Sequence, residues 1–216
     1  MNSIQKIHLD SYQKLIRNVW CVGRNYTEHA KEMNAEIPQT PLIFLKAGTS
    51  AYFGSLIHLP EWSNDIHHEL EIAFWIDEHF KFSHVTLALD LTARDIQSRA
   101  KEKGQPWTLA KSFIGACPLG SWIPLNDGLD PKNLMFELKI NNILKQTGSA
   151  NEMIFEPYAL LNYVKRHFTV TAHDVLLTGT PAGVGPLKSG DKLEANLFDT
   201  SSAHKEAILT CFWDVN

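Results

Sequence analysis

Two glutamates separated by one residue form the feature of this sequence that most strongly suggests chemistry. Glu69 and Glu71 alternate with the apolar Leu70 and Ile72, just after two histidines. In a β-strand, residues two apart point to the same face, so the two carboxylates should lie side by side. Their mutual repulsion is relieved by a cation, and an oxygen-only ligand set suits Mg²⁺, Mn²⁺ or Ca²⁺. The alternative is a solvated polar face on a half-exposed strand.

A third carboxylate follows an apolar run further along the chain. Asp90 comes where a predicted strand ends, a common position for functional groups, and Gln97 lies about two helical turns later. Asp90 could therefore complete a metal-binding set. The alternative is that Asp90 or Thr92 only caps the following helix, with Arg94 in ion pairs on its surface.

Two other groups could stabilise charge or move protons. Lys111 lies within an apolar and aromatic segment, so its ammonium group either reaches solvent or meets a charged partner. His29 and Glu32 are three residues apart in a predicted helix, where a carboxylate can orient an imidazole and raise its basicity. Such a pair can serve as a general base, although it can also be an ordinary surface pair.

The elements that must position these side chains are mostly strands. Period-two or continuous apolar patterns predict strands at residues 19–23, 42–46, 69–76, 85–91, 136–140, 143–146, 175–177, 194–198 and 208–213. Helical patterns cover residues 25–34, 93–103 and 157–167. Asn141 and Asn142 tolerate positive φ and predict a tight hairpin turn. Strands outnumber helices without a βαβ rhythm, so we expect a mainly β fold with a few helices (α+β).

Composition limits the classes of protein that need consideration. The 216 residues are 44% hydrophobic and 20% charged, with a net charge of −4, which fits one domain spanning residues 1–216. Basic residues do not cluster and no apolar stretch is long enough to span a bilayer, so we expect neither a nucleic-acid nor a membrane partner. The three cysteines are far apart, which predicts reduced, buried thiols and a cytoplasmic protein.

Five segments in order resemble one known family. They are residues 21–26 (CVGRNY), 67–71 (HHELE), 90–97 (DLTARDIQ), 107–113 (WTLAKSF) and 177–185 (LTGTPAGVG). Together they resemble the fumarylacetoacetate hydrolase (FAH) family. The similarity is greatest to its short single-domain branch, which includes acylpyruvate hydrolases, oxaloacetate decarboxylases and 2-hydroxyhepta-2,4-diene-1,7-dioate isomerases.

The resemblance implies a mixed β-sandwich roll of the FAH C-terminal-domain type, usually a homodimer. Residues 1–18 would form an N-terminal extension, and residues 25–35 a lid helix. Mg²⁺ or Mn²⁺ would be held by Glu69, Glu71 and Asp90. The implied catalytic residues are His29, Glu32 and Lys111, and the implied substrate-binding residues are Arg24, Gln97 and Thr180. The connection from Glu71 to Asp90 is shorter than in the family, because residues 79–85 stand in place of a helix.

The implied function is a metal-dependent hydrolase for a small β-dicarbonyl acid. It would cleave the C–C bond of acylpyruvates or related 2,4-dioxo acids through a metal-bound pyruvate enolate, with His29 activating water and Lys111 stabilising negative charge. Oxaloacetate decarboxylation and keto–enol or double-bond isomerisation need the same enolate and stay open as alternatives. A further alternative is a non-catalytic binding protein that keeps the fold.

Overall fold

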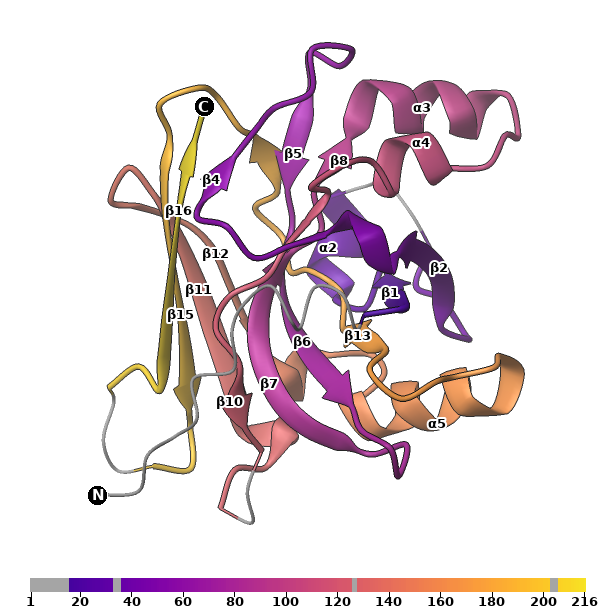
Figure 1. Cartoon of the computed structure of the whole chain (residues 1–216), viewed down its shortest axis with the longest axis vertical. Helices are drawn as coiled ribbons and strands as arrows, with labels where there is room; N and C mark the ends of the chain where they lie inside the picture. The colour runs from indigo at the N-terminus through magenta and orange to yellow at the C-terminus, as the bar shows by residue number, and fades with distance from the viewer. Residues whose placement is uncertain (1–15, 33–35, 126–127, 203–205) are drawn as a thin grey trace.

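The protein is built around two β-sheets (Figure 1), seen in a computed structural model that describes residues 16–32, 36–125, 128–202 and 206–216. The six-stranded sheet has the order β10 (Ile123–Pro124), β7 (Phe82–Leu89), β6 (Leu70–Ile76), β13 (Val175–Leu177), β1 (Asn18–Gly23) and β2 (Leu42–Ala47). The five-stranded sheet has the order β12 (Ile143–Ser149), β11 (Leu134–Ile140), β15 (Lys192–Asp199), β16 (Leu209–Val215) and β4 (Leu56–Ile57). Smaller sheets join β14 (Gly185–Pro186), β5 (Ile66–His68) and β8 (Thr92–Ala93), and β3 (Ala51–Tyr52) with β9 (Cys117–Pro118).

The main core lies between the two large sheets. Phe74 of β6 and Phe136 of β11 are fully buried in one cluster of apolar side chains. Strand β6 is buried along its whole length and lies between β7 and β13, so it is a central strand. The predicted mainly β sandwich is therefore confirmed, and burial of this apolar surface is the main force that holds the sheets together.

The helices lie outside this core. They are α2 (Thr27–Glu32), α3 (Arg94–Glu102), α4 (Thr108–Lys111) and α5 (Pro157–His167). Helices α3 and α4 lie together at the top of Figure 1, close to β8, whereas α5 lies at the bottom. Within the described residues, three short 3₁₀ turns occupy Gly48–Ser50, Pro131–Asn133 and Ala150–Glu152.

The hairpin predicted at Asn141 and Asn142 joins β11 to β12. Both residues have positive φ, 52° and 65°, as a two-residue turn between twisted strands requires. Asparagine adopts this conformation at lower cost than most residues, which explains why the sequence marks the turn so clearly.

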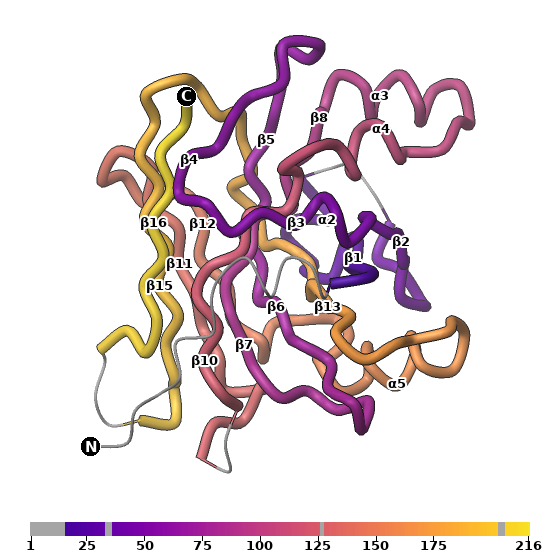
Figure 2. The backbone as a smooth tube through the Cα atoms, in the orientation of Figure 1, coloured from indigo at the N-terminus to yellow at the C-terminus, as the bar shows by residue number. Residues whose placement is uncertain are grey.

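The short connection between Glu71 and Asp90 is a β-hairpin. Glu71 pairs with Ala88 across β6 and β7, and the turn is closed where the Asp77 carboxylate accepts the backbone N–H groups of His79 and Lys81. Figure 2 shows this turn beside α5, at the opposite end of the strands from α3 and α4. Five strand residues, 72–76, separate this turn from Glu71 by about 20 Å, so the shortening leaves the acidic side chains in place.

Two of the segments expected from the sequence extend beyond the described residues. Residues 1–15 of the expected N-terminal extension and residues 33–35 of the expected lid helix lie outside the described residues. Cys21, Cys117 and Cys211 are free and buried, as predicted, and burial raises the pKa of each thiol. No helix in the described part of the chain is long and apolar enough to cross a membrane.

Candidate metal centre and active site

The three predicted metal ligands meet where the central strands end. Glu71 belongs to β6, Glu69 lies between β5 and β6, and Asp90 follows β7, where its N–H donates to the Glu69 carbonyl at 2.9 Å. One oxygen from each carboxylate lies within 4.8 Å of the others, and all three side chains are buried. A solvated polar strand is therefore the wrong interpretation. Asp90 is also no helix cap, because Ala93 holds that position.

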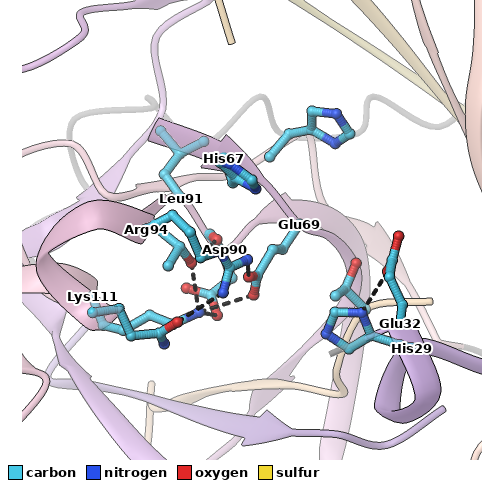
Figure 3. A network of polar contacts seen from close by, with 12 residues as sticks. His29, Glu32, His67, Glu69, Asp90, Leu91, Arg94 and Lys111 are labelled. Atoms are coloured by element: carbon cyan, nitrogen blue, oxygen red, sulfur yellow. Dashed lines mark hydrogen bonds and ion pairs between the residues drawn. The ribbon is translucent and has the colours of Figure 1, made fainter. Parts of the chain in front are cut away.

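Cations surround two of these three carboxylates. Glu69 pairs with Arg94 and with Lys111, whose Nζ lies 2.9 Å from Oε2. Asp90 contacts Lys111 Nζ at 2.6 Å and Lys46 Nζ at 2.8 Å. Figure 3 shows Arg94 and Lys111 converging on Glu69 and Asp90. Burial acts to raise the pKa of Glu69, but the charges of Lys111 and Arg94 outweigh burial and lower it.

Glu71 is the exception, because it has no ion-pair partner among the described residues. It accepts one hydrogen bond, from the Gly179 N–H at 2.6 Å. Gly179 has φ +94°, and a Cβ there would lie 2.7 Å from the Asn25 Cβ, so this close approach requires glycine. Burial, followed by repulsion from Asp90 and Glu69, raises the pKa of Glu71 well above its usual value.

This arrangement fits a divalent cation. A buried carboxylate with no cationic partner, beside two others, is the group whose charge a metal ion would balance. The donor atoms are all oxygens, which suits Mg²⁺ or Mn²⁺ better than zinc. Glu69, Glu71 and Asp90 are the residues that would hold such an ion.

Lys46 is a residue that the sequence interpretation missed. Its side chain is completely buried, and its Nζ donates to the carbonyls of Leu91, Lys111 and Ala116 besides contacting Asp90. The Lys46 ammonium group therefore connects three segments of the chain, which are the residues after β7, the end of α4 and the loop before β9. The available signal was the one used for Lys111, a lysine within an apolar run.

Lys111 and Thr180 make hydrogen bonds within the protein in addition to the catalytic and substrate-binding roles predicted for them. The three N–H bonds of Lys111 are directed to Glu69, Asp90 and Thr92, the last at 2.6 Å. The Thr180 hydroxyl, in the loop after β13, donates to the Leu70 carbonyl at 2.9 Å. Both residues line the pocket described below, but neither has a free side-chain hydrogen in this arrangement.

Gln146 is a second buried residue that the sequence did not single out. Its Oε1 accepts from the Leu70 N–H and contacts His68 Nδ1, both at 3.0 Å. Its Nε2 donates to the Thr180 hydroxyl and to the Pro181 carbonyl. This one amide joins the second sheet to the start of β6, where Leu70 lies between the two glutamates, and no local sequence signal predicts such a long-range contact.

A small pocket of about 60 Å³ opens over the acidic residues. Every predicted site residue except Glu32 lines it. Gln97 of α3 accepts from Arg94 Nη1 at 2.7 Å through Oε1, and its amide N–H groups, which have no hydrogen-bond partner in the described part of the chain, are available for a ligand. Arg24, directly after β1, and Lys101 and Arg94 of α3 add positive charge to the wall. The pocket is therefore suited to a small anion.

His29 and Glu32 form the predicted pair on α2. His29 Nδ1 lies 3.1 Å from Glu32 Oε2, and the other Glu32 oxygen accepts from the Gly183 N–H at 3.1 Å. His29 is buried and lines the pocket, so the alternative of an ordinary surface pair is wrong for its imidazole. With Nδ1 donating to a carboxylate, Nε2 is the nitrogen left to accept a proton. Figure 3 shows the pair on the far side of Glu69 from Lys111.

The structure thus combines a β-sandwich with three buried carboxylates that could hold a divalent cation and a neighbouring His–Glu pair. The chain belongs to the fumarylacetoacetate hydrolase family: residues 18–209 match the fumarylacetoacetate (FAA) hydrolase C-terminal model. The recognition made from the five sequence segments is confirmed.

Known relatives agree with this membership. The chain is 41% identical over 192 residues to the mitochondrial oxaloacetate tautomerase FAHD1 of Bos taurus, covering 84% of this chain and 87% of the relative. It is 40% identical over 190 residues to the oxaloacetate tautomerase YcgM of Escherichia coli, covering 82% and 87%. A crystal structure of fumarylpyruvate hydrolase from Pseudomonas aeruginosa with Mn²⁺ and pyruvate superposes with a TM-score of 0.83 at 25% identity, covering 93% of this chain and 89% of that one.

Proposed function

We propose that this protein is a divalent-metal-dependent enzyme that interconverts the enol and keto forms of oxaloacetate. The observation that carries the proposal is the small pocket with buried carboxylates on its floor, basic side chains on its wall and His29 at its side. The similarity to two oxaloacetate tautomerases supports the choice of substrate. Acylpyruvate hydrolysis, expected from the sequence, becomes the second candidate.

The bound cation would supply Lewis-acid charge at the 2-oxo oxygen of the substrate. His29 Nε2 takes the proton from the enol hydroxyl, and the Glu32 carboxylate at Nδ1 stabilises the resulting imidazolium. The imidazolium then returns one proton to C3, which gives the keto form with no net gain or loss of atoms. Gln97 positions the substrate through its free amide hydrogens.

The position of the His29 imidazole in the pocket keeps hydrolysis as a candidate reaction. The same imidazole could take a proton from water, which would then attack a distal carbonyl of an acylpyruvate. The likeness to a fumarylpyruvate hydrolase structure supports this second reaction. Decarboxylation of oxaloacetate needs no attacking water and would be recognised by its product, pyruvate.

The test uses freshly dissolved enol-oxaloacetate and acetylpyruvate, each with Mg²⁺, with Mn²⁺ and with EDTA. Metal-dependent loss of the enol absorbance without loss of total oxaloacetate would support the tautomerase. Formation of pyruvate from oxaloacetate would indicate a decarboxylase, and cleavage of acetylpyruvate a hydrolase.

His79→Gln serves as the matched control for His29→Gln, since His79 is an exposed histidine in the β6–β7 turn. The tautomerase predicts that only the His29 variant slows the reaction. No acceleration of any of these reactions by the wild type, despite metal binding, would refute the enzyme and favour a binding protein. The predicted homodimer and cytoplasmic location stay predictions.

A further inference from the structure

One face of α3 runs along the wall of the pocket. Arg94, Gln97 and Lys101 are spaced by three and four residues, which places them on the same side of a helix. All three line the pocket. Arg94 pairs with Glu69 beside the metal-binding residues, and Lys101 lies about 10 Å further along the helix axis. The helix therefore carries positive charge from the floor of the pocket to its rim.

Lys101 has no acidic partner among the residues that the structure describes. Its side chain is exposed, and its Nζ lies 5.2 Å from the centroid of the Trp107 ring, which restrains it at the pocket wall. Desolvation and the positive charges of Arg94, Arg24 and Lys111 lower the pKa of Lys101. This ammonium group is held near other cations, an arrangement that an anion would stabilise.

Arg24 is the second such cation. It lies directly after β1 with a φ of 59°, a left-handed conformation that is unfavourable for a residue with a side chain. It lines the pocket, and its guanidinium makes no hydrogen bond or ion pair within the described ranges of the chain. Arg94 and Lys111, in contrast, are already paired with Glu69.

We propose that Arg24 and Lys101 bind the second carboxylate of a dicarboxylic substrate, whose first carboxylate and 2-oxo group face the acidic residues. This inference rests on the proposed function and specifies its substrate class. An acylpyruvate with an uncharged acyl group would leave both cations without an anion. The pair therefore selects a dicarboxylate such as oxaloacetate over such acylpyruvates.

Two unreactive ligands that differ only at the far end isolate this contact. 2-Hydroxysuccinate and 2-hydroxybutyrate share the 2-hydroxy acid, but only the first has a second carboxylate. Their Kd values are measured by isothermal titration calorimetry on the Mg²⁺-loaded protein. The wild type should bind 2-hydroxysuccinate about tenfold more tightly, the size expected for a charge-assisted contact.

Lys101→Met and Arg24→Met should each reduce this preference several-fold, and the double variant should bring it close to one. Lys101→Arg should retain it. Lys103→Met is the matched control, because Lys103 is an exposed lysine just after α3 that does not line the pocket, and it should change nothing. A preference near one in the wild type, or an unchanged preference in the two Met variants, would overturn the inference.

Oxaloacetate turnover measured on the same proteins separates this inference from the proposed function. A wild type that prefers 2-hydroxysuccinate through Lys101 but does not accelerate any oxaloacetate reaction would retain the dicarboxylate site and refute the enzyme. If wild type and Lys101→Met turn over oxaloacetate at the same rate and with the same KM, the proposed enzyme is retained and the dicarboxylate site is refuted.

Discussion

The two halves of the candidate site are built differently. The carboxylates of Glu69, Glu71 and Asp90 lie where the central strands end. Buried cations hold Glu69 and Asp90, and the Gly179 N–H donates to Glu71. The His29–Glu32 pair lies on a six-residue helix. That helix follows Asn25, whose buried amide bonds to the Phe155 and Thr178 carbonyls, and its far end is held by the Glu32 contact with Gly183.

The difference suggests that the two halves have different functions. Groups that must present fixed negative charge to a metal ion sit in the rigid interior, where their geometry is set before binding. The group that must carry a proton sits on a short helix outside the core, held at its start by the hydrogen bonds of Asn25 and at its end by the contact of Glu32 with Gly183. We expect substitutions in the first half to change stability and metal binding, and substitutions in the second half to change turnover alone.

The largest effect should come from Lys46→Met. Removing the ammonium takes one of the two cations from Asp90 and leaves three buried backbone carbonyls without the Lys46 donor, so we expect unfolding to become easier by about 3–5 kcal/mol. Urea denaturation measures this change. The matched control is Lys31→Met, which removes an exposed lysine of α2 and should change stability by less than about 0.5 kcal/mol. Equal effects would mean that Lys46 does not hold the cluster together.

His29→Gln should separate the two halves most clearly. Loss of the proton carrier should reduce turnover by about 10²- to 10³-fold, while Mg²⁺ affinity and unfolding midpoint stay at wild-type values. Steady-state kinetics and a metal titration of the same sample test both statements. A parallel loss of metal affinity would show that the helix and the carboxylates form one unit, contrary to the comparison.

Glu71→Gln should abolish the stabilisation that a metal ion gives. At a free Mg²⁺ concentration of about 100 times Kd, the wild type should gain about 2.7 kcal/mol and the variant nothing. The metal-free variant should be more stable than the metal-free wild type at neutral pH, because it no longer buries a carboxyl group whose ionisation is opposed by burial and by the charges of Asp90 and Glu69. Thermal unfolding of the wild type and of Glu71→Gln, each with Mg²⁺ and with EDTA, measures the four stabilities.

The pH dependence of that difference follows from the direction of the pKa shift. A carboxyl whose pKa is raised in the folded state stabilises the fold while it is protonated, and that stability is lost as pH rises from the unfolded value, about 4.3, through the folded pKa. The advantage of Glu71→Gln in EDTA should therefore grow as pH rises. Metal affinity of the wild type should also rise with pH, since the ion displaces the Glu71 proton. A pH-independent difference would contradict an unpaired Glu71.

Glu32→Gln should have the smallest of these effects. The amide keeps an oxygen near His29 but loses the charge that stabilises an imidazolium, so we expect about a tenfold decrease in turnover. Stability should change little, because the Glu32 side chain is 34% exposed. A loss as large as that of His29→Gln would indicate that Glu32 has a direct part in proton transfer.

The sequence by itself determined the fold class, most elements and the identity of the acidic cluster. Hydrophobic periodicity predicted β13 and α5 with the boundaries that the structure has, because it reflects burial on one face of each element. Glu69 and Glu71 were recognisable as candidate metal ligands because a cation relieves the repulsion between neighbouring carboxylates, although the strand pattern alone also fitted a solvated polar face. The five family segments were informative because they preserve residue order as well as type.

Only the tertiary structure decided how these residues are held and charged. Asp90 reaches Glu69 because β6 and β7 form a hairpin, and Gln146 reaches Leu70 across two sheets. Lys46 and Lys111 look alike in the sequence, yet one bonds mainly to backbone carbonyls and the other to carboxylates. The reason is physical: contacts between residues far apart in sequence depend on strand order and sheet packing, which local patterns do not encode.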